Sequence, residues 1–358
     1  MNESSGKSSG TTPVTTLHGT PTGTLNNTRW SWYLLVSLIA VTSAEGLSWS
    51  TPLIFPTGIF VLVIYGLHYL LIMDFLVRRR ALTLRALAVG GVVIGFTTES
   101  LLTKVIWNPP WDEGETLRIL GVGVFEVGFI VLVWHAWMSM ALPVALTLRS
   151  FGLADILTPL QTRRILLALP LTMWIAAGLN GANPLLILLY SALNGFGILL
   201  AAWLFQHNAR RQPFRDVTDM ALTRRERRIV WGLTILVYAV FLPHRAEAFP
   251  AAGPFVLGMA LVAGSIWLLG AVRRADTRQM PPVGPWRFQS RQFLRYLGYF
   301  LAASLVLSVV ALVLNPVALP LTFVLMMLSI VPGDAYMLRL VWRLRPRRVQ
   351  LQEVITHG

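Results

Sequence analysis

The chain of 358 residues contains no cysteine, and charged residues make up only 13% of it. Without cysteine it can form no disulfide bond, no thiolate nucleophile and no cysteine-ligated metal centre. Hydrophobic residues make up 55% of the chain, which leaves too little polar surface for a soluble enzyme or a nucleic-acid-binding protein. The composition therefore excludes both classes, and no nucleic-acid partner is expected.

Long apolar runs recur along the chain, each close to the roughly twenty residues that a helix needs to cross a hydrocarbon core of about 30 Å. With a mean hydropathy of +0.62, these runs predict an all-α fold, a polytopic membrane bundle of about ten transmembrane helices. The expected spans are 30–48, 52–77, 85–107, 118–147, 164–180, 184–206, 228–245, 252–272, 293–314 and 317–338. The lipid bilayer is therefore the first expected partner.

Acidic residues are scarce, with 16 Asp and Glu against 30 Lys and Arg, and the basic residues are unevenly distributed. Lys and Arg accumulate in the cytoplasmic loops of membrane proteins. Of the 30 basic residues, 27 fall in six alternate segments: the N-terminal tail, the loops at 78–85, 149–164, 207–228 and 273–295, and the C-terminal segment. This alternation predicts that the N-terminus and the C-terminus are both cytoplasmic.

The same pattern divides the chain into five segments. They are a disordered polar tail at 1–28, a six-helix membrane core at 29–206, a basic cytoplasmic loop at 207–227, a four-helix membrane extension at 228–340 and a basic cytoplasmic tail at 341–358. The basic loop ends in Thr223-Arg-Arg-Glu226, a capping-box pattern that predicts the start of the next helix. Its arginines are interpreted as topological charge rather than as a specific binding site.

Ionisable side chains deep in a bilayer are costly, so each one is a candidate for a functional role. The acidic residues near the ends of spans are expected to be interfacial or salt-bridged, and they are Asp74, Asp334, Glu45 and Glu247. The candidates that remain in the interior are Glu99, Glu126, His68 and His135.

Glu99, His135 and Asn194 are predicted to lie within about 5 Å of the bilayer midplane, from the ~1.5 Å rise of a helix per residue. Gly91 and Gly95 form a ridge of small residues on the Glu99 side of their helix, so another helix is expected to pack there. Glu126 is nine residues from His135, which would put the two side chains on opposite faces of an α-helix.

The order of these polar residues resembles that of the glutamate intramembrane proteases of the CAAX-protease and bacteriocin-processing (CPBP) family. The family pattern is Glu-Glu-x-x-x-Arg on one helix, a His on the next and His-x-x-x-Asn two helices later. Glu99-Ser-Leu-Leu-Thr-Lys104 fits the first motif, His135 the second and Tyr190-Ser-Ala-Leu-Asn194 the third. The resemblance covers about residues 85–200.

The resemblance implies an intramembrane peptidase of a prokaryotic cytoplasmic membrane, acting on a peptide or membrane-protein substrate. Glu99 would be the general base, His135 its partner and Asn194 an orienting donor. Lys104 and Tyr190 would have secondary catalytic roles, although both depart from the family pattern, as does Ser100. These departures also fit a relative that has lost its catalytic activity.

Two other classes of function stay open on the sequence alone. One is a membrane transporter or a protein that binds a lipid or small molecule, and the other is a non-catalytic membrane scaffold. No cofactor or metal is expected, because Glu99 and His135 supply two ligands where a catalytic zinc site normally has three from the protein.

Overall fold

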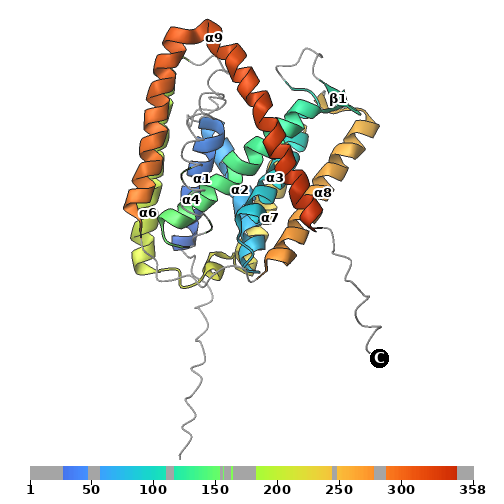
Figure 1. Cartoon of the computed structure of the whole chain (residues 1–358). Helices are drawn as coiled ribbons and strands as arrows, with labels where there is room; N and C mark the ends of the chain where they lie inside the picture. The colour runs from blue at the N-terminus through green and yellow to red at the C-terminus, as the bar shows by residue number, and fades with distance from the viewer. Residues whose placement is uncertain are drawn as a thin grey trace, which may run out of the picture.

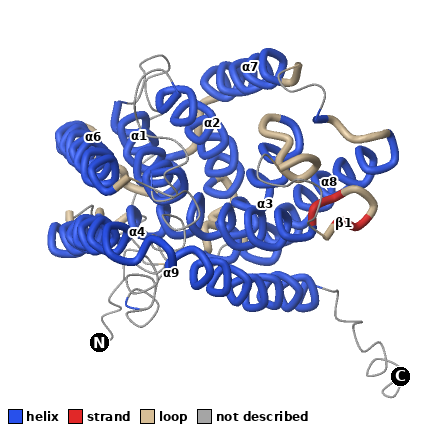
Figure 2. Tube along the Cα trace, turned by 90° about the horizontal axis from the view of Figure 1, so that it is seen from above, coloured by secondary structure: helices blue, strands red, loops and turns tan. Residues whose placement is uncertain are grey.

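The computed structural model describes residues 27–46, 57–109, 117–153, 156, 163, 183–243, 248–277 and 288–344. Over these residues the chain is a bundle of helices (Figures 1 and 2). Its described strands are β1 (Arg118–Ile119) and β2 (Val122–Gly123), which form one short antiparallel hairpin. The predicted all-α class is confirmed.

The helices fall into three kinds. The α-helices are α1 (Asn27–Val41), α2 (Thr57–Val77), α3 (Leu84–Leu101), α4 (Leu142–Ser150), α6 (Pro184–Arg211), α7 (Arg224–Phe241), α8 (Ala252–Asp276) and α9 (Ser290–Leu344). Two segments, η1 (Thr42–Gly46) and η2 (Glu126–Ala141), are π-helices, and η3 (Val217–Met220) is a short 3-10 helix.

Within the described ranges, six helical segments are long and apolar enough to cross a membrane. They are Gly58–Val77, Leu84–Leu101, Glu126–Ser150, Ile187–Arg211, Ala252–Asp276 and Arg291–Val310. The chain is therefore a multi-pass membrane protein, but the predicted count of ten spans is not reached. One reason is that α1 has only 15 residues, and the predicted span at 164–180 lies outside the described residues.

The predicted span at 118–147 begins too early, because its first residues form the β1–β2 hairpin. The hairpin turns at Leu120 and Gly121, whose φ angles are +51° and +79°. Positive φ at two successive residues is incompatible with a helix but suits a tight hairpin turn. The membrane-spanning segment starts only at Glu126.

The two predicted spans at 293–314 and 317–338 belong to one helix of 55 residues, α9. In Figure 1, α9 rises along one side of the bundle, bends at the top and descends across the front. Pro316 and Pro320 lie near its middle, and a helix bends at proline because proline lacks the amide hydrogen that the helical ladder needs. The predicted break between the spans is therefore a bend.

The centre of the bundle is the contact between α3 and η2, with α8 packed along α3 and α1 lying against α2, α4 and α6. A Cβ atom on Gly91 would collide with the His135 carbonyl oxygen and would lie 2.6 Å from the Ala136 Cα. A Cβ on Gly95 would lie 3.0 Å from the Val131 Cγ1. The expected close approach of another helix to this glycine ridge is therefore present.

The outer faces of α6, α7, α8 and α9 expose large apolar side chains, among them Phe196, Ile235, Trp267 and Leu338. An apolar surface of this extent is stable where lipid, rather than water, surrounds it. The exposed faces therefore agree with a position inside a bilayer.

Gly91→Ala is expected to lower the free energy of unfolding by about 1–3 kcal/mol, because the added methyl group must push α3 away from the η2 backbone. Unfolding by SDS titration in mixed micelles measures this change. Gly232→Ala is the matched control, since no atom lies within 4 Å of a Cβ built there. Equal stability of Gly91→Ala and wild type would show that the α3–η2 contact is looser than described.

Candidate functional site

Glu99 and His135 form a buried pair at the contact between α3 and η2. The Glu99 Oε1 and His135 Nε2 atoms are 3.0 Å apart, and the two residues are 8% and 4% exposed. The Thr103 hydroxyl donates to the other carboxylate oxygen at 2.6 Å. Both oxygens of this largely buried carboxylate therefore have a hydrogen-bond partner.

The end of α3 explains how Thr103 reaches back to Glu99. The Leu102 amide still donates to the Thr98 carbonyl, but Lys104 has a φ of +59°, in the left-handed region. A non-glycine residue in this conformation ends a helix and reverses the chain. Thr103 is therefore turned toward the last turn of α3, where Glu99 lies.

Helix α2 places aromatic and polar side chains beside the pair. The Tyr65 ring is stacked near the His135 ring, with centroids 6.2 Å apart, and its hydroxyl donates to Glu45 at 2.6 Å. One turn further, His68 Nδ1 donates to the Ile64 carbonyl, and the Tyr238 hydroxyl of α7 lies 2.8 Å from His68 Nε2. Four helical segments and η1 therefore contribute polar groups to one interior region.

We call this region the intramembrane cluster, and it consists of Glu45, Tyr65, His68, Tyr69, Glu99, His135, Ser139 and Tyr238. Two of its buried polar atoms have no hydrogen-bond partner among the described residues: His135 Nδ1 and the Tyr69 hydroxyl. Buried polar atoms are usually hydrogen-bonded, and an exception calls for a water, an ion or a ligand. The cluster therefore has hydrogen-bonding capacity that the described side chains do not fill.

Asn194 is not part of this cluster. It lies on α6, is 1% exposed, and neither of its amide atoms has a hydrogen-bond partner in the described residues. Helix α6 packs against α1, α9 and η1, the segment that carries Glu45. The structure brings together Glu99 and His135, and among the described residues it shows no hydrogen bond that joins Asn194 to this pair.

The two secondary candidates, Tyr190 and Lys104, make no hydrogen bond to Glu99 or His135 that the structure shows among its described residues. Tyr190 is half-buried one turn before Asn194 on α6. The Lys104 side chain is completely buried, and its ammonium lies 4.7 Å from the centroid of the Phe249 ring. A cation–π contact of this kind stabilises a buried ammonium, which is a structural role for Lys104.

Glu126 was expected on the opposite face of its helix from His135, but that expectation assumed an α-helix. The segment between them is the π-helix η2, in which the Leu142 amide donates to the Trp137 carbonyl five residues earlier. This wider turn changes which residues share a face. Glu126 is completely buried, and its carboxylate contacts Gly123 in the hairpin.

The acidic residues expected near span ends have different environments. Glu45 accepts the hydrogen bond from Tyr65, and Glu247 lies outside the described residues. Asp334 was expected to be interfacial or salt-bridged. It is half-buried on α9 facing Gly128 of η2, where a Cβ would lie 3.4 Å from its Oδ2, and the described residues offer it no ion pair.

Metal binding has no support within the described ranges, where no group of three His, Asp or Glu side chains could hold an ion. Glu99 and His135 remain a pair without a third ligand. Proton exchange within the pair needs no metal, since an imidazole and a carboxylate 3.0 Å apart are within hydrogen-bond distance.

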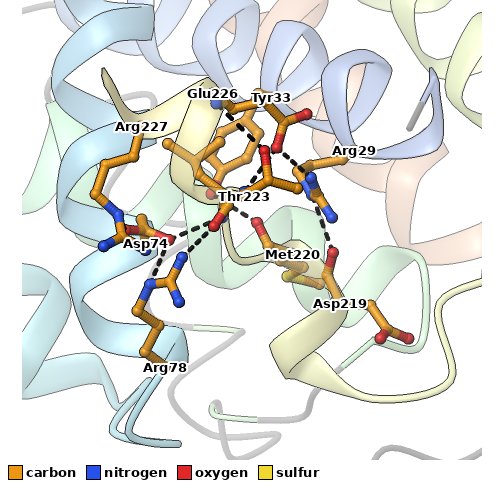
Figure 3. Close-up of polar contacts among 10 residues, drawn as sticks. Arg29, Tyr33, Asp74, Arg78, Asp219, Met220, Thr223, Glu226 and Arg227 are labelled. Atoms are coloured by element: carbon orange, nitrogen blue, oxygen red, sulfur yellow. Dashed lines mark hydrogen bonds and ion pairs between the residues drawn. The ribbon is translucent and has the colours of Figure 1, made fainter. Parts of the chain in front are cut away.

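The arginine-rich end of the bundle, at the bottom of Figure 1, contains a second polar network (Figure 3). Its centre is the buried carboxylate of Asp74 on α2, which accepts hydrogen bonds from the Leu222 amide at 2.8 Å, Arg78 at 2.9 Å and Arg227 at 2.8 Å. The expectation that Asp74 is salt-bridged agrees with this geometry. The network fixes the start of α7 against the end of α2.

Arg29 joins helix α1 to the same network. It donates to Glu226 at 2.6 Å and to the Asp219 carbonyl at 3.0 Å. Glu226 also accepts from the Thr223 amide at 2.7 Å, and its own amide donates to the Thr223 hydroxyl at 3.2 Å. The predicted capping box is confirmed.

This loop is docked onto the bundle, which the interpretation of its arginines as topological charge did not predict. Asp216 pairs with Arg80, and Arg227, in the first turn of α7, pairs with Asp74. The opposite charges of Arg29 and Glu226 are compatible with an ion pair. The two residues are 197 positions apart in the chain, however, and no spacing rule predicts a pairing over such a separation.

The six long apolar helical segments and the exposed apolar outer faces together define a multi-pass helical membrane protein. The model of an uncharacterised membrane protein family matches residues 34–348, which is most of the chain, and the protein belongs to that family. No curated protein and no solved structure matches it.

This family is not the CPBP family, so the assignment by resemblance is wrong. The three motifs that suggested it are short, and single polar residues at helical spacing occur in many membrane bundles.

Asp74→Ala is expected to lower the free energy of unfolding by about 1.5–3 kcal/mol, because the buried Leu222 amide and two arginines lose a charged acceptor. The 207–227 loop should also be cut faster in limited proteolysis, since its attachment to α2 is lost. Arg225→Ala is the control, because Arg225 is exposed and lies outside the network. Wild-type cleavage rates in Asp74→Ala would contradict the docking role.

Proposed function

We propose that the protein is a proton-linked membrane transporter in which Glu99 and His135 form the protonation site. The observation that supports this function is the buried carboxylate–imidazole pair, 3.0 Å apart, whose His135 Nδ1 atom has no partner among the described residues. Ionisable groups are rare inside membrane bundles and are typical of proton relays and substrate pathways.

The pair can hold one proton at either residue without changing its net charge. With the proton on His135 the pair is an imidazolium and a carboxylate, and with the proton on Glu99 both groups are neutral. Adding a second proton leaves an uncompensated positive charge in a medium of low dielectric, which is costly. Protonation can therefore be coupled to a rearrangement that admits water or substrate.

His135 has a geometry suited to relaying a proton. Its Nε2 faces Glu99, and its Nδ1 has no partner among the described residues. An imidazole that accepts a proton at Nδ1 and releases one from Nε2 moves a proton across the ring. The Nδ1 atom is thus the proposed entry point, and Glu99 the proposed acceptor.

Glu45 and Tyr65 mark the proposed route to the pair. Helix α1 begins at the arginine-rich end, where Arg29 binds Glu226, and Glu45 lies beyond its far end in η1. The Tyr65 hydroxyl donates to Glu45, and the Tyr65 ring stacks beside the His135 ring, so Tyr65 lies next to both. Stacking carries no proton, so in this proposal a water would bridge the step to His135 Nδ1. Protons would enter from the end opposite the arginines.

The proposal also includes the orientation of the protein in the membrane. We place the arginine-rich end, the N-terminus and the C-terminus on the cytoplasmic side of a prokaryotic cell membrane, because Lys and Arg favour that side. The second limb of α9, together with α1, α7 and the 164–180 segment, would bring the six clear spans, which already include the first limb of α9, to ten.

A non-catalytic scaffold is the second candidate, and the tight contact of Gly91 with the His135 backbone favours it. A dry, closely packed junction stabilises a bundle without any transport. The two functions differ in one measurable property, which is whether the protein moves protons across a sealed membrane.

Proteoliposomes loaded with a pH-sensitive dye test the transport function. Under a potassium diffusion potential, with and without a panel of amino acids, sugars and organic cations, wild type is expected to acidify the lumen. Glu99→Gln and His135→Gln should each reduce the rate by at least about tenfold, because each removes half of the protonation site.

His207→Gln is the matched control, since His207 is exposed on α6 and stacks on Trp203 rather than on any cluster residue. Size-exclusion profiles establish that each variant is folded. Wild-type rates in Glu99→Gln would eliminate the proposed site. Wild-type liposomes that never acidify faster than empty ones would leave the scaffold as the better function.

A further inference from the structure

A cavity of about 480 Å³ lies between the end of α8 and the end of α9. Its walls include Trp267, Ala271 and Leu268 of α8 and Val341 and Leu344 of α9. These side chains are apolar, and none of them belongs to the intramembrane cluster. The cavity has no part in the proposed proton site.

One charged side chain, Arg274, lines this apolar cavity. Its guanidinium folds back along α8, and a Cβ on Gly270, one turn earlier, would lie 3.6 Å from its Nη1. Arg274 is exposed, and no hydrogen bond or ion pair joins it to the residues that the structure describes. The cavity therefore has apolar walls and one available cation among its lining residues.

The surrounding charges leave this end of α8 positive. Asp276 is the nearest acidic residue in the sequence, but Arg85 and Thr83 already bind its carboxylate. The adjacent Arg273 stacks on the Phe75 ring at 3.7 Å. No described acidic group is left to neutralise Arg274, so an anion from outside the chain would be favoured there.

Exposed tryptophans flank the same region. Trp267 and Trp342 are 64% and 67% exposed, on α8 and α9 respectively. Tryptophan is enriched at the level of lipid headgroups, where its ring is half in lipid and half in water. Trp267 lines the cavity and Trp342 directly follows the lining residue Val341, so we place this end of α8 and α9 near the headgroup level.

We propose that this cavity binds one anionic phospholipid, with the phosphate on Arg274 and an acyl chain along Trp267, Ala271 and Val341. A phospholipid combines the apolar chain that fits the walls with the negative charge that fits the arginine. Basic pockets between membrane helices recognise anionic headgroups in this way. The site is independent of the proposed transport function.

Native mass spectrometry and thermal unfolding of the full chain in detergent test the proposal, with phosphatidylglycerol, phosphatidylcholine and soluble glycerol phosphate as probes. Wild type is expected to bind phosphatidylglycerol at least fivefold more tightly than phosphatidylcholine, about 1 kcal/mol, and to unfold at a higher temperature with it. Arg274→Gln should lose this preference. Ala271→Trp, which fills the cavity, should lose binding of both lipids.

Arg225→Gln is the matched control, an exposed arginine of α7 outside the cavity, and should bind like wild type. An unchanged preference in Arg274→Gln, or no preference in wild type, would overturn the proposal. Displacement of phosphatidylglycerol by an equal concentration of glycerol phosphate would show a soluble phosphate ester as the ligand, and would also overturn it.

Discussion

The close approach of α3 to η2 is the contact on which the interior of this protein depends. Gly91 and Gly95 remove the side chains that would hold the two backbones apart, and this brings the end of α3 level with the middle of η2. Apolar burial adds little to helix association in a bilayer, because lipid is as apolar as leucine, so close packing and hydrogen bonds decide which helices meet. The Glu99–His135 pair is a direct consequence of this contact.

The polar groups of the protein are concentrated at two levels, which have different physical roles. At the arginine-rich end, Asp74 and Glu226 receive several hydrogen bonds each, and the docked loop holds α1, α2 and α7 together. In the intramembrane cluster, by contrast, His135 Nδ1 has no described partner. A saturated network stabilises a fold, whereas an unsaturated one in a low dielectric is costly and is typical of functional sites.

Much of the fold could be predicted because its signals are local. The apolar runs, the capping box at Thr223 and Glu226 and the small-residue ridge at Gly91 each depend on residues a few positions apart. The errors arose where a local rule was wrong for the segment. Residues 118–123 form a hairpin with positive φ, and η2 has π-helical turns, so an α-helical period misplaced Glu126 relative to His135.

The sequence by itself determined that this is a helical membrane protein with one arginine-rich end, because length, hydropathy and charge are properties of each segment alone. Only the tertiary structure decided that Glu99 meets His135, and that the 207–227 loop docks onto α1 and α2. The physical reason is that lipid-facing and interior positions are equally apolar in a bilayer. The rotation and neighbours of each helix are therefore set by the packing of the whole bundle.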